Sequence, residues 1–139
     1  MRNLHRTRWL LVFQLLAGFC DVTTGVLLVF APVWTLSLIG VRHPPQPIEF
    51  ASFIGAFVMA VGSAYLYAAR WPMIAANAPC WQSVWWFTAM SRTLVAGLLL
   101  WKILTGHLEA AWLTVALTDA LLAIFQWIGL RMGFLSFEG

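Results

Sequence analysis

Apolar residues run along this 139-residue chain in four long stretches, with short breaks between them. Each stretch holds about 21 to 24 residues, so as a helix it reaches about 30 to 36 Å, which matches a hydrocarbon core of about 30 Å. Because a backbone in lipid must satisfy its own hydrogen bonds, we expect helices. The four predicted spans are Trp9–Phe30, Ile48–Ala69, Trp81–Leu104 and Ala110–Leu130.

The breaks between these stretches carry the residues that end helices and form turns. They are Ala31-Pro32, Val41 to Pro47, Trp71-Pro72 with Ala78-Pro79, and Thr105-Gly106. None is long enough to fold by itself. The pattern therefore predicts an all-α, integral membrane four-helix bundle, up-down-up-down, that forms one transmembrane domain over residues 1–139.

The composition agrees with a membrane protein, since 62% of residues are hydrophobic and only 9% are charged. Soluble domains carry roughly a quarter charged residues. The net charge of +3 comes from eight Lys and Arg that are spread along the whole chain and form no basic patch. We therefore expect membrane lipids and larger membrane subunits as partners, and neither nucleic acid nor a soluble substrate.

The basic residues outside the spans or at their ends predict the orientation of the chain. Five of them fall on the side that holds the N-terminus, the second loop and the C-terminus, and two fall on the other side. The five are Arg2, Arg6, Arg8, Arg70 and Arg131, and the two are Arg42 and Lys102. The positive-inside rule then places both termini in the cytoplasm, and we expect a multi-pass protein of a bacterial inner membrane.

Tryptophan residues gather near the ends of the predicted spans, as in the aromatic belts of membrane proteins. Trp9, Trp71, Trp81, Trp85, Trp86 and Trp127 fall towards the inner boundary, and Trp34, Trp101 and Trp112 towards the outer one. We interpret most of them, together with Phe87, as anchors at the lipid interface.

Once the span ends and the loops are set aside, three charged residues remain inside the spans: Asp21, Arg92 and Asp119. Each lies 11 or 12 residues from the cytoplasmic end of its span, which is roughly 16 to 18 Å at helical rise. A single charge at this depth costs about 2.5 to 3.5 kcal/mol on insertion scales. We therefore predict that the three pair with one another inside the bundle.

Gln14 and Gln126 lie seven residues to the cytoplasmic side of Asp21 and Asp119, on the same helix faces. They predict a second polar layer in one buried polar cluster. Two roles stay open for this cluster. It fixes the register of the helices, or it carries a proton, since two acids with one base leave a net negative group in which one carboxyl is expected to be protonated.

Small residues recur at a spacing of four in the second span, which is typical of closely packed membrane helices. The predicted interface consists of Ser52, Gly55, Ala56, Ala60, Gly62, Ala64 and Ala68. This face is expected to pack on another helix of the bundle or on a partner protein.

No combination of residues predicts a catalytic or metal site. His5, His43 and His107 all fall outside the spans, and no pair has ligand spacing, although His43 and His107 share the outer side. The chain also lacks a phosphate-binding loop, a nucleophile with its base, and a paired Cys motif. We expect no enzyme and no intrinsic cofactor, only grooves that contact lipid, quinone or pigment.

The layout of an acid in the first span, Phe53-Ile54-Gly55-Ala56 with Gly62-Ser63-Ala64-Tyr65-Leu66 in the second, and Thr118-Asp119-Ala120-Leu121-Leu122 in the fourth resembles small bacterial membrane proteins of the DoxX-like kind. This resemblance implies a compact bundle that accompanies respiratory or redox complexes. It implies no catalytic residue. The first functional hypothesis is thus a non-catalytic accessory subunit of an energy-converting complex, respiratory or photosynthetic.

The segment Cys20-Asp21-Val22-Thr23-Thr24-Gly25 also resembles the first helix of small multidrug transporters, in which an acid is central. The chain departs from that family in carrying Arg92 at the depth of its acids and a second acid, Asp119. The alternative hypothesis is a homodimeric, proton-coupled transporter that uses Asp21 or Asp119.

Overall fold

The computed structural model describes residues 2–71 and 75–135, without the side chains of residues 2–6 and 75. Pro72 and the side chains of Arg2, His5 and Arg6 therefore lie outside the described residues. Helices form nearly all of the described chain, and no strand occurs in it. The long helices are α1 (Arg2–Phe30), α3 (Glu49–Ala69), α4 (Ala78–Leu104) and α5 (Leu113–Arg131), and the short ones are α2 (Pro32–Leu38), η1 (Ala75–Asn77) and η2 (Ala110–Trp112).

The prediction of four apolar helices of membrane length is confirmed. The segments long and apolar enough to cross a bilayer are Thr7–Phe30, Glu49–Ala69, Ala78–Leu104 and Ala110–Arg131. Two helices begin earlier than predicted: α1 begins at Arg2, and α4 begins at Ala78, so that Ala78-Pro79 belongs to the helix and is not a break before it. Proline is well tolerated in a first turn, because its missing N–H has no intrahelical acceptor there.

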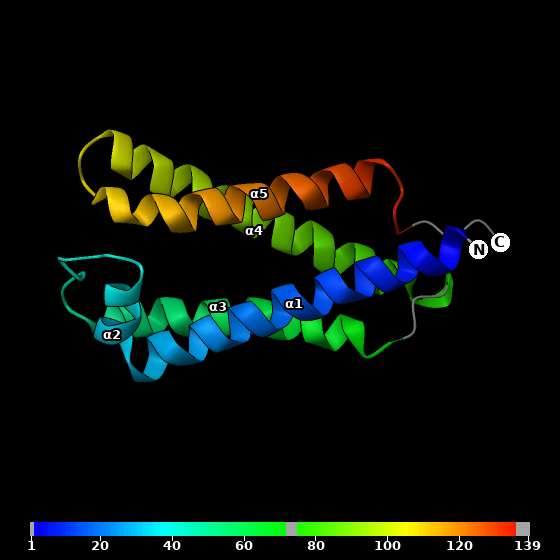
Figure 1. Ribbon diagram of the computed structural model, residues 1–139, viewed down its shortest axis with the longest axis horizontal. Helices are drawn as coiled ribbons and strands as arrows, with labels where there is room; N and C mark the ends of the chain where they lie inside the picture. Colours follow the sequence, from blue (N-terminus) through cyan, green and yellow to red (C-terminus); the bar gives the residue numbers. More distant parts are fainter. Residues whose placement is uncertain (1, 72–74, 136–139) are drawn as a thin grey trace.

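The four long helices associate as two pairs (Figure 1). One pair consists of α1 and α3, which pack along most of their lengths, and the other consists of α4 and α5. Backbone contacts between the pairs are much sparser than contacts within them. The side chains that join the two pairs therefore determine how the pairs sit together.

Glycines bring α1 and α3 into close contact. A Cβ atom on Gly62 would lie 2.6 Å from the backbone nitrogen of Val22, and one on Gly25 would lie 2.6 Å from the carbonyl oxygen of Gly55. Ser52 Oγ also donates a hydrogen bond to the carbonyl of Val29 across this interface. Helix packing in membranes relies on such close approach, because lipid gives no hydrophobic force between helices.

The predicted small-residue face of α3 is only partly the face that packs. Gly55, Gly62 and Ala68 are buried, and Ser52 and Ala64 are half-buried, but Ala56 and Ala60 are exposed. A spacing of four advances about 40° per step around a helix of 3.6 residues per turn, so it cannot stay on one face over five positions. The prediction that Ala56 and Ala60 share this face with Gly55 and Gly62 is wrong for the contact with α1.

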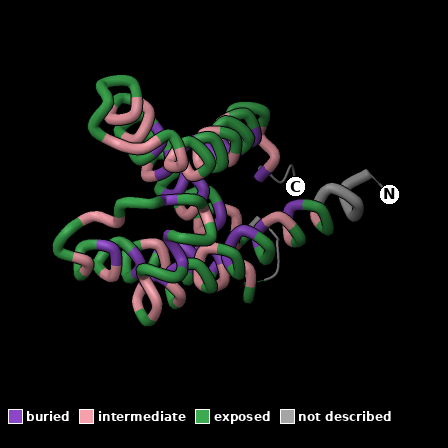
Figure 2. The backbone as a smooth tube through the Cα atoms, turned by 60° about the vertical axis from the view of Figure 1, so that its left-hand side comes forward, coloured by how far each residue is buried: buried purple, intermediate pink, exposed green. Residues whose placement is uncertain are grey.

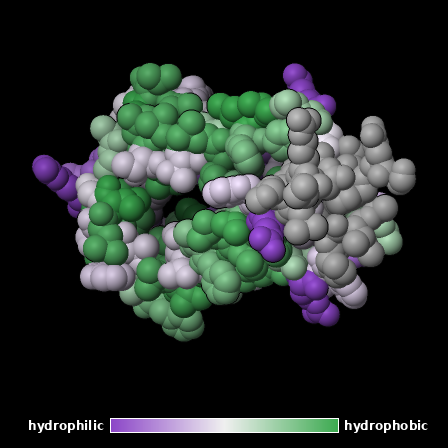
Figure 3. All heavy atoms as spheres, turned by 45° about the vertical axis from the view of Figure 1, so that its right-hand side comes forward, coloured by the Kyte–Doolittle hydropathy of each residue, from purple (hydrophilic) through white to green (hydrophobic). Residues whose placement is uncertain are grey.

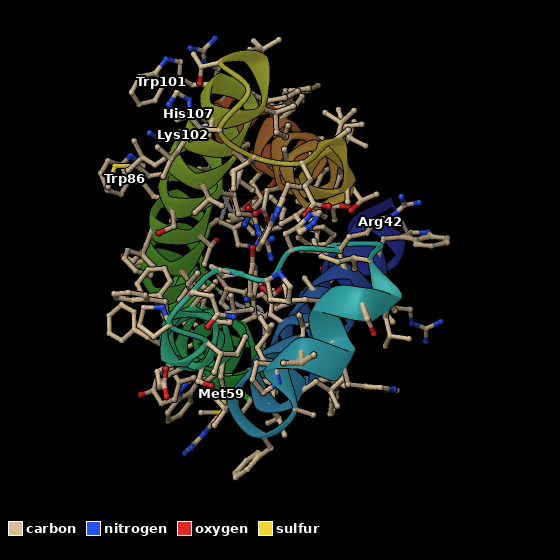
Figure 4. All side chains as sticks on the ribbon, turned by 90° about the vertical axis from the view of Figure 1, so that its left-hand side faces the viewer. Arg42, Met59, Trp86, Trp101, Lys102 and His107 are labelled. Atoms are coloured by element: carbon tan, nitrogen blue, oxygen red, sulfur yellow. The ribbon has the colours of Figure 1, made fainter. Side chains whose placement is uncertain are left out.

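Contacts between distant segments define the two ends of the bundle. At the terminal end, Leu10, Trp81, Trp85 and Leu135 form one apolar cluster from the start of α1, the start of α4 and the segment after α5. At the loop end, residues 39–48 and 105–112 meet through Glu109. Figure 4 looks onto the loop end and shows Trp101 and Lys102 pointing outward from α4.

Short helix α2 was not predicted. Its seven residues follow Ala31 directly, and Leu36 packs with Leu28, Val41 and Ala51 into an apolar cluster at the loop end. Thr35 Oγ1 donates to the carbonyl of Ala31 within this turn. A helix this short gives no periodic signal in the sequence, because it completes only about two turns.

Two tryptophans lie in the core and not at the lipid interface. Trp81 and Trp85 are both 0% exposed, so their assignment to an aromatic belt is wrong. Trp86 and Phe87 are exposed, as are Trp9, Trp34, Trp71 and Trp101. Figure 2 shows that buried residues occupy the helix sides that face one another, and Figure 3 shows hydrophobic atoms over much of one outer surface.

Candidate functional site: an ion cluster between the helix pairs

The ion cluster, formed by Asp21, Arg92 and Asp119, draws its residues from three different helices. Asp21 lies on α1, Arg92 on α4 and Asp119 on α5, so both helix pairs contribute. Each residue sits well inside its helix, where the backbone hydrogen bonds fix the direction in which the side chain leaves. The three residues lie at the same depth in their helices, as residue counting predicted, because helical rise is nearly constant.

Arg92 binds both acids at the same time. Its Nη1 donates to Asp119 Oδ1, and its Nη2 donates to Asp21 Oδ2. The Arg92 side chain is only 7% exposed, and the Asp21 and Asp119 side chains are 15% and 16% exposed. The guanidinium thus forms a bridge from the α1–α3 pair to the α4–α5 pair, in a geometry suited to its planar fork of donors.

Tyr65 completes the environment of Arg92 from α3. Arg92 Nε lies 3.4 Å from the Tyr65 hydroxyl, to which it donates, and Arg92 Cζ lies 5.8 Å from the centre of the Tyr65 ring. Tyr65 is 0% exposed. With this contact, all four long helices contribute to the site, and each nitrogen of the guanidinium has a partner.

Gln14 forms part of a second polar layer, towards the terminal end. Its Nε2 donates to the carbonyl of Tyr65 at 3.2 Å, and its Oε1 accepts from Trp85 Nε1 at 2.7 Å. These two bonds join α1 to α3 and to α4. Because Gln14 is 0% exposed, both ends of its amide need partners inside the protein.

Gln126 occupies the same layer on α5. Its Nε2 donates to Thr88 Oγ1 at 2.8 Å, and Thr88 in turn donates to the carbonyl of Val84. In the described part of the chain, Gln14 and Gln126 bond to Tyr65, Trp85 and Thr88 and not to the ion cluster. The buried polar cluster thus has two adjacent layers, as predicted, and Tyr65 connects them through its contacts with Gln14 and Arg92.

A clasp of loop residues joins the two helix pairs at the loop end. Glu109 accepts hydrogen bonds from the backbone N–H groups of Arg42 at 3.0 Å and His43 at 2.6 Å, and its carboxylate lies 2.9 Å from His43 Nδ1. The bond from the Arg42 N–H is the main reason that the pKa of Glu109 lies below its usual value of 4.5, with the His43 contacts adding to it.

The described residues include no group of three or more His, Cys, Asp or Glu side chains that could hold a metal ion. His43 contacts Glu109, whereas His107 contacts Thr105 through its Nδ1 atom. The two histidines predicted on the outer side thus have separate partners.

Sequence reasoning did not identify Tyr65, Trp85, Thr88 or Glu109 as members of these networks. Trp85 and Thr88 look like ordinary residues of an apolar helix until the position of Gln14 or Gln126 is known. Tyr65 gave a usable signal: it is one of only two tyrosines, and it lies three residues after Gly62, on the face of α3 that packs against α1.

Comparison of the chain with protein-family models, with curated proteins and with solved structures finds no match.

Proposed function

We propose that this chain is a non-catalytic accessory subunit of a larger membrane complex, in which it forms a stable helical unit within the bilayer. The observation that carries this proposal is the pair of hydrogen bonds that Arg92 donates, one to Asp21 and one to Asp119. A guanidinium whose nitrogens all have protein partners is engaged in holding helices together. Such a mostly buried ion cluster, with three hydrogen bonds to the guanidinium, suits a structural role better than the binding of a passing substrate.

The outer surface of the bundle also supports this proposal. In the most apolar stretch of each span, only 22% to 28% of the residues are buried. Large apolar side chains such as Phe53, Leu94 and Leu121 are exposed on three of the helices. Lipid or the helices of larger subunits can cover these faces. The resemblance to DoxX-like proteins directs the search for partners to energy-converting complexes, respiratory or photosynthetic.

We further propose an up-down-up-down arrangement across a bacterial inner membrane, with both termini in the cytoplasm. Arg8, Arg70 and Arg131 belong to the helix ends opposite the end that carries Arg42, in a loop, and Lys102, in the last turn of α4. The excess of basic residues on one side favours that side as the cytoplasmic one. A membrane-impermeant thiol reagent tests this, since it should label an Arg42→Cys variant only from outside the cell and an Arg131→Cys variant only after lysis.

Extraction of the full chain from its native membrane in mild detergent, followed by native mass spectrometry, tests the accessory role. Release in a fixed ratio with larger membrane subunits is the expected result. An Asp21→Asn variant should leave with the same subunits, because its remaining contacts preserve the fold. Recovery of a free homodimer alone would overturn the proposal.

A homodimeric proton-coupled transporter is the second candidate, and the charge balance of the ion cluster favours it. Two acids face one base, and both carboxylates keep some exposure, at 15% and 16%. Such a group could hold and release a proton near the middle of the bilayer. Reconstituted vesicles test this directly: a transporter would show proton-driven uptake that Asp21→Asn or Asp119→Asn abolishes, whereas an accessory subunit would show none.

A further inference from the structure

An apolar groove lies between α1 and α5 and is open to the outside of the bundle. Trp9, Phe13 and Leu16 line it from α1, and Phe125 of α5 with Phe134 beyond it lines the other side. Its volume is about 550 Å³.

Aromatic rings form the floor of this groove. The ring centres of Phe13 and Phe125 lie 4.7 Å apart, and Trp85 lies behind both at 5.4 and 5.9 Å. Trp85 is fixed from its far side by Gln14, which accepts a hydrogen bond from its Nε1. The floor is thus held by tertiary contacts, and the groove is a formed feature rather than a loose gap between helices.

Two arginines lie at the level of the groove's terminal end, outside its lining. Arg8 directly precedes Trp9, and Arg131 directly follows Leu130, which packs against the cluster around Leu10. Both arginines are exposed, and both mark the limits of apolar spans, which begin at Thr7 and end at Arg131. At this depth they reach the headgroup layer, where each Lys or Arg attracts anionic lipid.

We propose that the groove between α1 and α5 binds one acyl chain of an anionic phospholipid, whose phosphate headgroup lies at the level of Arg8 and Arg131. The apolar, aromatic lining accepts a hydrocarbon chain, and the groove is bordered by the bilayer along its length. The two arginines at the level of its terminal end add the preference for an anionic headgroup. Lipid binding at this site is independent of the proposed accessory role, because the groove is formed by this chain alone and needs no partner subunit.

The test uses the full chain, reconstituted in vesicles that contain both phosphatidylcholine and phosphatidylglycerol. After transfer to mild detergent, native mass spectrometry measures which lipid stays bound. One phosphatidylglycerol per chain is the expected result. Equal retention of both lipids, or retention of neither, would overturn the proposal.

Variants then separate the tail site from the headgroup site. Leu16→Trp places a large ring in the groove and should abolish retention, whereas Leu94→Trp, on an equally exposed position of α4, should leave it unchanged. Arg8→Gln and Arg131→Gln should each weaken retention about fivefold, as expected for one interfacial charge. Wild-type retention in Leu16→Trp, or an equal loss in an Arg42→Gln control at the loop end, would contradict the assignment.

Discussion

The buried Arg92 side chain donates hydrogen bonds to two carboxylates and one hydroxyl. This single side chain links residues of α1, α3 and α5 to α4. Removing it would leave two acids facing each other in a mostly buried site. The Asp21 and Asp119 side chains would then have to be protonated or exposed to water. The role of Arg92 is thus to balance charge where the bilayer offers no other partner.

Arg92→Gln should lower the free energy of unfolding by about 3 to 5 kcal/mol, because it breaks a buried ion group and leaves its partners uncompensated. The measurement is reversible denaturation in detergent. Lys102→Gln serves as the control, since Lys102 lies in the last turn of the same helix, and its effect should stay within about 0.5 kcal/mol. A loss in Arg92→Gln no larger than in the control would count against the bridge.

Gln14→Leu should cost about 1 to 3 kcal/mol of unfolding free energy, since it leaves the Nε1–H of buried Trp85 without its acceptor. The double variant with Trp85→Phe, which removes that donor, should lose less than the sum of the two single variants. Additive losses in this double-mutant cycle would show that the hydrogen bond carries no coupling.

The ion cluster was predictable from the sequence because it depends only on helical rise. Three charges at equal depth in four apolar stretches have few ways to avoid lipid other than to meet. The hydrogen-bond partners Tyr65, Trp85 and Thr88 were not predictable in this way, because their roles depend on how the helices are rotated about their axes. Rotation follows from packing, which a single sequence does not reveal at this precision.

Among the elements, the closest contact is that of α1 with α3, and glycine makes it possible. The predicted spacing of four failed because it winds around the helix, whereas Gly55 and Gly62, seven residues apart, return to nearly the same face. The partner positions Gly18 and Gly25 on α1 are also seven apart. Glycines spaced seven residues apart on both helices would have been the better predictor of this interface.

Gly62→Ala should destabilise the protein by about 1 to 3 kcal/mol, because the new methyl group would overlap the backbone of α1 and push the helices apart. Gly97→Ala is a matched control within α4, where the added carbon would have no atom within 4 Å apart from its chain neighbours and the adjacent backbone of its own helix. That control should gain about 0.5 to 1 kcal/mol through helix propensity. Equal effects of the two substitutions in thermal unfolding would refute the close contact.

At the scale of the whole molecule, two helix pairs are joined at three levels. The Gln14–Trp85 bond lies nearest the terminal end, the ion cluster lies in the middle, and the clasp of Glu109 with Arg42 and His43 closes the loop end. Sequence analysis predicted the middle level and the two glutamines, but not the clasp. A loop carboxylate meeting two backbone N–H groups leaves no pattern in the sequence.

The clasp should weaken in acid. Because the pKa of folded Glu109 lies below its usual value of 4.5, its contribution to stability is fully present above that value and is lost as the pH falls through the lower, folded pKa. Amide chemical shifts of Arg42 and His43, followed by NMR in micelles, should move with a midpoint below 4.5. A Glu109→Gln variant should remove this transition, and a midpoint at or above 4.5 would contradict the contact.

The structural role of the ion cluster is tested most directly by the unfolding free energy of the charge-neutral triple variant Asp21→Asn, Arg92→Gln, Asp119→Asn, measured beside Arg92→Gln alone. If the cluster ties the helix pairs through balanced charge, the triple variant should recover most of the stability lost by the single one, because its amides can still bond to one another and no charge remains buried. A triple variant as unstable as Arg92→Gln would contradict this account.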